Sequence, residues 1–118
     1  MSPPTRRVVH TETFLVDMRL ADLDLDRLRR CFAELFDRAA HAVQLAGHEQ
    51  DDAVLERFLV VRSALGQEVA VRADWLTDRE RLLDHTRAAV EGESGTSADM
   101  HELTILGLRV VALVETGP

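Results

Sequence analysis

The stretch LERFLVVRSALGQEVAVRADW, residues 55–75, decides between two folds for this chain. Val69, Val71 and Ala73 alternate with polar or small side chains, a period of two that is typical of a strand. The adjacent β-branched residues Val60 and Val61 also favour extended backbone. The stretch therefore predicts two strands, residues 58–62 and 69–75, that pair across a turn near residues 64–67.

The same stretch also fits a helix. Asp51 or Asp52 would cap it, Val54, Phe58, Val61 and Leu65 recur at steps of three and four, and Gly66 would end it. This alternative makes the chain mainly α, with residues 52–91 helical and one β pair formed by the ends of the chain. Whether residues 55–66 are strand or helix stays open at this point.

The flanking segments give the order in which the elements follow one another. Alternation over residues 8–20 predicts a strand, and apolar residues at helical spacing over 25–46, followed by Gly47, predict a long helix. A capping box, Thr77 to Glu80, opens a second helix that the stretch 92–97 breaks, and residues 103–115 form an apolar final strand. With the hairpin reading the order is β-α-β-β-α-β, which predicts an α+β, two-layer ferredoxin-like sandwich with both helices on one sheet face.

Length and composition predict one globular domain. A chain of 118 residues is the size of one ordinary domain, so we expect residues 7–118 to form it, with residues 1–6 as a disordered lead because of two adjacent prolines. No apolar run approaches the roughly 20 residues that span a bilayer, and the start is too polar for a signal peptide. Cys31 is the only cysteine, so no internal disulfide forms. The default expectation is a cytoplasmic protein.

The charges exclude several partners and chemistries. The chain is acidic, with a net charge of −7, which argues against nucleic acid and acidic membrane surfaces as partners. All fourteen basic side chains are Arg, and Lys and Tyr are absent. Schiff-base catalysis and P-loop phosphate binding need a lysine amine, so both are excluded. We expect neither a metal site nor a cofactor, because no ligand set has a helical or loop spacing that would hold one.

A few side chains are candidates for a site. His10 and Glu12 are two residues apart on the first strand, so they project to the same side and could serve as a base and its orienting carboxylate, or lie solvated near the strand's start. Phe14, Trp75 and His101 are candidates for lining a ligand pocket: an inward residue of the first strand, an anchor before the second helix and a loop residue at the mouth of the sheet.

The sheet face away from the helices is apolar in this reading. It would carry Leu15 on the first strand, Leu59 and Val61 or their alternates on the second, and Ile105, Val111 and Leu113 on the last. Such a face marks an interface or a ligand groove, so a homo-oligomer is expected. The leading hypothesis is a non-catalytic, self-associating accessory, regulatory or small-ligand-binding domain with an apolar ligand or a protein as partner. The alternative is a small homo-oligomeric enzyme of isomerase, cyclase or oxygenase type, in which His10 and Glu12 transfer a proton inside an apolar cavity between sheets.

Overall fold

Two helices and four strands follow one another in the order β-α-β-β-α-β. A computed structural model describes residues 5–48, 52–63, 65–74, 76, 78–95, 97 and 99–116. The elements are β1 (Thr5–Arg19), a 3-10 turn (Leu20–Asp22), α1 (Leu25–Leu45), β2 (Val54–Arg62), β3 (Glu68–Arg72), α2 (Arg79–Ser94) and β4 (Thr104–Thr116). The α+β class is confirmed. The decisive stretch forms the β2–β3 hairpin, so the helical alternative for residues 52–91 is wrong.

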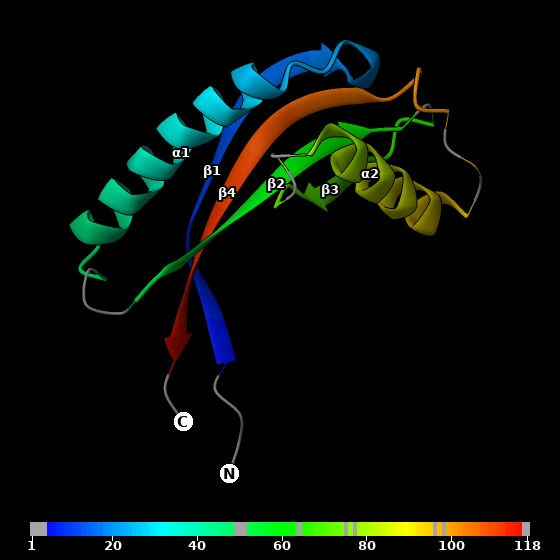
Figure 1. Cartoon of the computed structure of the whole chain (residues 1–118). Helices are drawn as coiled ribbons and strands as arrows, with labels where there is room; N and C mark the ends of the chain where they lie inside the picture. The colour runs from blue at the N-terminus through cyan, green and yellow to red at the C-terminus, as the bar shows by residue number, and fades with distance from the viewer. Residues whose placement is uncertain are drawn as a thin grey trace.

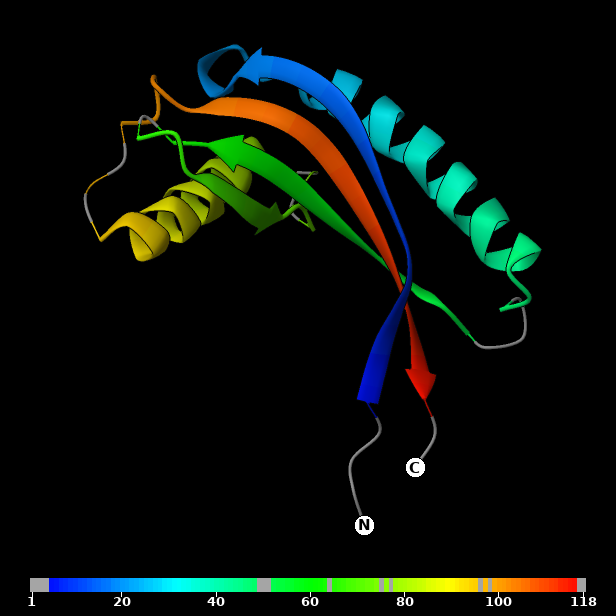
Figure 2. The same ribbon diagram turned by 180° about the vertical axis from the view of Figure 1, so that it is seen from behind.

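The four strands form one sheet in the order β1-β4-β2-β3, and every neighbouring pair is antiparallel. The order of strands across the sheet does not confirm the predicted ferredoxin-like arrangement. The order of the elements along the chain is as predicted, but it does not determine which strands are neighbours in the sheet. Both helices lie in front of the sheet in Figure 1 and behind it in Figure 2. The helices therefore cover one face, and the opposite face, here called the open face, carries no helix.

Capping aspartates start both helices. The side chain of Asp24 accepts a hydrogen bond from the backbone N–H of Arg27, and Asp78 does the same for Arg81. The cap of α2 is therefore Asp78, whereas the predicted cap, Thr77, lies outside the described residues. The helix ends within the stretch 92–97 that the sequence predicts to break it: α2 continues to Ser94 and ends before Gly95, whose φ of 71° is the left-handed value that a glycine accepts without strain.

The core lies between the helices and the covered sheet face. Helix α1 buries residues at steps of three and four, and they pack against the alternating inward residues of the strands. The largest fully buried side chains are Leu20, Leu28, Phe32, Leu35, Leu59, Val61, Leu82, Thr86, Leu103, Ile105, Leu108 and Val110. No helix in the described part of the chain has the length and apolar character needed to cross a membrane.

A bulge in β4 changes which face its residues occupy. Val60 pairs with Gly107 and the next residue, Val61, pairs with Ile105, so Leu106 has no counterpart on β2. Ile105 is consequently fully buried in the core, and its predicted place on the open face is wrong. At the bulge the backbones approach closely: a Cβ on Gly107 would lie 2.7 Å from the backbone oxygen of Phe14.

The ends of the predicted segments differ from the observed ones by a few residues. β1 begins at Thr5, two residues before the expected start of the ordered domain, and residues 1–4 lie outside the described part. β2 begins at Val54, four residues earlier than predicted, and β3 ends at Arg72. The longer β2 includes Arg57 in the sheet.

Candidate functional site

His10 and Glu12 do lie together, and an arginine joins them. His10 Nε2 lies 3.4 Å from Glu12 Oε2, while Arg38 of α1 donates from Nε and Nη2 to the other carboxylate oxygen at 3.1 and 2.9 Å. All three side chains are partly exposed. The cluster ties the edge strand β1 to α1, and the carboxylate is more tightly held by Arg38 than by His10.

This cluster lowers the pKa of Glu12. Burial acts to raise that pKa, but the hydrogen bonds from Arg38 and His10 and the charges of both residues together outweigh it. Glu12 is therefore held as a carboxylate. A carboxylate bound by arginine on one oxygen and near a histidine on the other can orient the ring.

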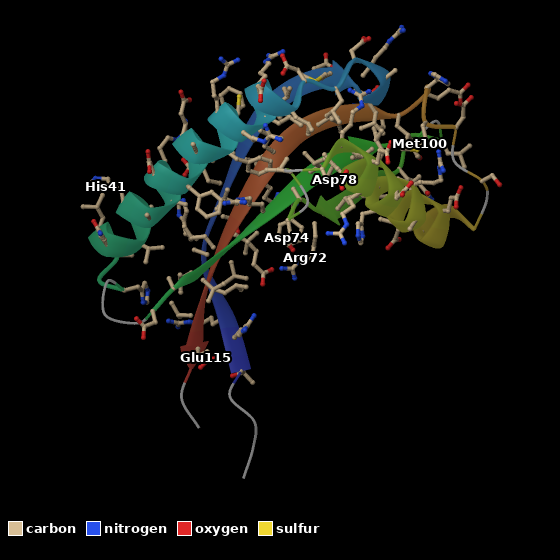
Figure 3. The ribbon with its side chains drawn as sticks, in the orientation of Figure 1. His41, Arg72, Asp74, Asp78, Met100 and Glu115 are labelled. Atoms are coloured by element: carbon tan, nitrogen blue, oxygen red, sulfur yellow. The ribbon has the colours of Figure 1, made fainter. Side chains whose placement is uncertain are left out.

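Two of the three predicted pocket residues, Phe14 and His101, do not line the same cavity. Phe14 lies on the helix-covered face of β1, opposite Leu108, with 36% of its surface exposed. His101 lines a small cavity of about 180 Å³ with Leu20, Ala21, Arg79, Leu83 and Met100, and Phe14 is not part of its lining. Trp75 lies outside the described residues. Figure 3 labels Met100 at the end of the molecule where this small cavity lies.

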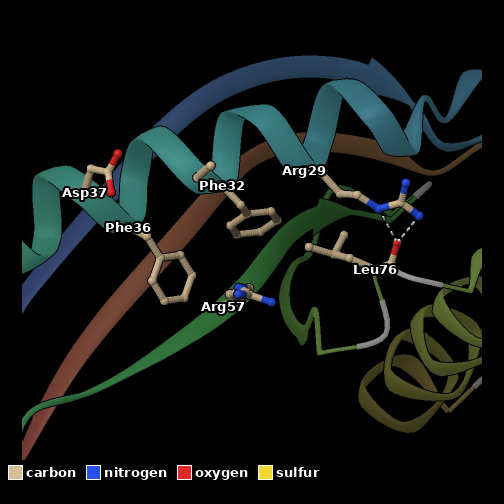
Figure 4. A pocket seen from close by; sticks show the side chains of 7 residues that line it. Arg29, Phe32, Phe36, Asp37, Arg57 and Leu76 are labelled. Carbon is tan, nitrogen blue, oxygen red and sulfur yellow. Dashed lines mark hydrogen bonds between the residues drawn. The ribbon is translucent and has the colours of Figure 1, made fainter.

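A larger cavity lies between α1 and β2, on the helix-covered side of the sheet. Its volume is about 380 Å³, within the range of small-molecule sites. The lining residues are Arg29, Phe32, Ala33, Phe36, Asp37, Arg57 and Leu76. Figure 4 shows the rings of Phe32 and Phe36 projecting from α1 toward β2, with Arg57 across from them. The walls are mainly apolar, and three of the lining side chains are charged.

Arg57 is the unusual member of this lining. It occupies an inward position of β2, between Leu55 and Leu59, and pairs in register with the fully buried Val110 of β4. Its Cζ lies 4.4 Å from the ring centroid of Phe36, a cation–π contact. Its Nε is buried and has no hydrogen-bond partner, and no ion pair joins this guanidinium to any residue in the described ranges.

Arg29, the other arginine of the cavity, donates a hydrogen bond from each of its three guanidinium nitrogens. Its Nε and Nη2 donate to the backbone oxygen of Leu76 at 3.0 and 2.8 Å, and its Nη1 donates to Asp26 at 2.8 Å. The dashed lines in Figure 4 mark the two bonds to Leu76. Arg29 therefore holds the segment before α2 against α1 at the rim of the cavity, which leaves Arg57 as the cation available to a bound molecule.

The open face is arranged in cross-strand rows. Two end rows are apolar: Leu15, Gly107, Val60 and Ala70 at one end, and Val8, Leu113 and Val54 at the other. Two middle rows carry charge: Thr13, Arg109, Phe58 and Arg72, then Thr11, Val111 and Glu56. Leu15, Val8 and Val54 are 80%, 55% and 46% exposed. The face therefore matches the prediction at Leu15, Val111 and Leu113, and Phe58 and Val60 are the alternates that β2 places there.

Ion pairs cross the middle of this face. Glu56 lies between Arg6, at 3.6 Å, and Arg72, at 3.8 Å, and Arg72 also bonds to Asp74 at 2.9 Å. Figure 3 shows Arg72 and Asp74 close together. The open face is thus apolar at both ends, with a charged belt between them, rather than apolar throughout.

The inward position of Arg57 can be inferred from the sequence, but only if the second strand begins earlier than predicted. With β2 predicted to start at Phe58, Arg57 belongs to a connector and attracts no attention. Extending the alternation backward places Leu55, Arg57, Leu59 and Val61 on one face, so an arginine occupies a core position. A charged residue on the inward face of a strand is the pattern that identifies this cavity.

Comparison with protein-family models, with curated protein sequences and with solved structures finds no match for this chain. Among the described residues there is also no group of three or more His, Cys, Asp or Glu side chains placed to hold a metal ion. The candidate functional features of the molecule are therefore the cavity, the His10 cluster and the open face.

Proposed function

We propose that this chain is a non-catalytic domain that self-associates through its open face and serves as an accessory, regulatory or small-ligand-binding module. The observation that carries the proposal is the row pattern of that face, in which strongly exposed Leu15, Val8 and Val54 lie at its two apolar ends. Exposed apolar groups of this extent on a sheet are typical of an interaction surface.

The pattern is self-complementary, which favours a second copy as the occupant. A half-turn about an axis that runs across the strands lays the Leu15 row of one copy on the Leu113 row of the other. The same operation lays the row of Arg109 and Arg72 on the row of Glu56. Apolar groups then meet apolar groups and basic groups meet an acidic one, as an isologous two-fold interface requires.

Substitution of Leu15 by glutamate tests the assembly. Because Leu15 is 80% exposed, Leu15→Glu costs the monomer little, whereas it removes a buried leucine from the proposed interface. Loss of that burial alone is about 2 kcal/mol, so the dimer dissociation constant should rise at least about thirtyfold. Sizing with light scattering should give a dimer for the wild type and a monomer for Leu15→Glu.

The matched control is Leu45→Glu, since Leu45 is 75% exposed at the end of α1, away from the open face. This variant should remain a dimer. A wild-type protein that is monomeric at micromolar concentration, or a Leu15→Glu variant as dimeric as the wild type, would contradict the proposal.

A second function, that of a small enzyme, is favoured by one contact, the 3.4 Å approach of His10 Nε2 to Glu12. In this alternative His10 takes a proton from a substrate and the carboxylate orients its ring. A panel of isomerase, cyclase and oxygenase substrates tests it: turnover that His10→Ala abolishes and His41→Ala, on the outside of α1, retains would replace the non-catalytic proposal.

A further inference from the structure

The cavity between α1 and β2 is lined by a cation, Arg57, whose buried Nε has no hydrogen-bond partner in the part of the chain that the structure describes. A guanidinium carries five N–H donors and no acceptor, so it needs acceptors from its surroundings. The guanidinium Cζ lies 4.4 Å from the centroid of the Phe36 ring, and this contact gives the N–H groups no hydrogen-bond acceptor. The buried Nε has no acceptor among the described residues. Arg57 as a whole is only partly buried and lines the cavity, so an acceptor that enters there would approach the rest of the guanidinium.

The rest of the lining restricts what that acceptor can be. Two arginines and one aspartate line the cavity, and Arg29 is already paired with Asp26, so Arg57 is the cation left for a bound molecule. A monoanion pairs with Arg57 alone, whereas a dianion such as a phosphate monoester would bring a second negative charge close to Asp37. The planar fork of an arginine matches the two oxygens of a carboxylate.

Because the cavity lining is mainly apolar, we expect the bound anion to carry an apolar group as well as its charge. Phe32, Ala33, Phe36 and Leu76 form the apolar part of the lining, and Phe32 and Leu76 are almost fully buried. A dry cavity of about 150 Å³ is enough to hold a benzene ring. The volume here, about 380 Å³, therefore holds a ring-sized group together with a carboxylate.

We infer that this cavity binds a small monocarboxylate with a flat apolar body, and that Arg57 binds its carboxylate while Phe32 and Phe36 contact the ring. This specifies the ligand class of the proposed binding role, but it does not need the assembly. Arg57 and the open-face residues lie on opposite sides of β2. A monomeric protein that binds the carboxylate would overturn the assembly and leave this site intact.

Benzoate, phenylacetate and 2-naphthoate are the probes, each compared with its neutral amide. Titration into the full-length ¹⁵N-labelled protein, followed by ¹H–¹⁵N correlation spectra, gives both the affinity and the location. Amide signals of Ala33 and Phe36 on α1 and of Arg57 on β2 should shift, and those of Leu15 on the open face should not. The neutral amide should bind at least about tenfold more weakly, because it cannot form the charge-assisted pair.

Arg57→Gln is the test variant, and Arg62→Gln is its matched control on the exposed end of the same strand. Arg57→Gln should raise the dissociation constant for the best carboxylate at least about tenfold, and Arg62→Gln should leave it unchanged. Phe36→Leu should weaken binding of the ring-bearing probes. Arg57→Gln and Phe36→Leu should both keep the wild-type spectrum away from the cavity, which shows that they fold.

Three outcomes would overturn the inference. Shifts absent with all three carboxylates up to their solubility would remove the site altogether. Equal binding of acid and amide, with no effect of Arg57→Gln, would refute the ligand class and leave a binding role in place. Shifts confined to residues outside the cavity lining would show that the carboxylates bind somewhere else.

Discussion

Replacing Arg57 by methionine should make the ligand-free protein more stable. Methionine keeps an unbranched stem that can fill the space between Phe36 and the sheet, and it removes a buried N–H that has no acceptor. Leaving such a donor unsatisfied costs about 2 kcal/mol. The substitution also removes the cation–π interaction with Phe36, which stabilises the wild type by about 1 kcal/mol. The balance is about 1 kcal/mol of added stability.

For a chain of this length, that gain raises the melting temperature by about 4 °C. Thermal and urea unfolding followed by circular dichroism measure it, and Arg62→Met, at an exposed end of β2, serves as the control with no expected change. A decrease of more than about 1 kcal/mol in the stability of Arg57→Met would refute the reasoning, because it would mean that the guanidinium has a strong partner.

Two further substitutions test the bulge and the Glu12 cluster. Gly107→Ala should lower stability by about 1 to 3 kcal/mol, because its Cβ would meet a backbone oxygen at 2.7 Å that no side-chain rotation can move. Gly92→Ala, with open space around it inside α2, should instead raise stability by up to about 1 kcal/mol, and unfolding curves in which the two variants behave alike would contradict the close approach. The folded pKa of Glu12 lies below its ordinary value of 4.5, so its contribution to stability is present above that pH and is lost as the pH falls through the folded value. Glu12→Gln should therefore be less stable than the wild type at pH 7. The difference between their free energies of unfolding in urea should shrink as the pH falls below about 4.5. A difference that does not change with pH would mean that Arg38 does not hold the carboxylate.

The sequence contains enough to predict the elements but not their order in the sheet. Alternation in residues 69–73 and helical spacing in α1 are local patterns, so they indicate strand and helix without reference to the rest of the chain. The placement of β4 between β1 and β2 depends on which strands pair over long sequence distances. No local pattern contains that information.

The bulge shows a second limit. A period of two predicts that Ile105 shares a face with Val111, and this holds only if every residue of the strand is paired. Leu106 is extra, so the phase of the alternation reverses there and Ile105 enters the core. The glycine next to it, Gly107, is a weak signal for a bulge, since glycine in a strand often marks one.

Only part of the candidate site can be predicted from the sequence. The spacing of His10 and Glu12 places them on one side of a strand, and they do lie within 3.4 Å, but Arg38 comes from α1 and no spacing on β1 reveals it. Arg57 escapes prediction because local patterns define the ends of a strand poorly. Its significance comes from burial against Phe36, which is a tertiary contact.

The stability of Arg57→Met also tests whether Arg57 belongs to a binding site. If it does, Arg57→Met is the more stable protein without ligand, and the wild type is the more stable protein when ligand is bound. Without ligand the variant is more stable by about 1 kcal/mol, the difference between the unsatisfied donor and the cation–π interaction. A ligand that binds only the folded wild type adds RT ln(1 + [L]/Kd) to its stability. The wild type should therefore overtake Arg57→Met once benzoate exceeds its dissociation constant by about four- to fivefold. Two curves of melting temperature against benzoate concentration that never cross would mean that the chain keeps Arg57 for some purpose other than carboxylate binding.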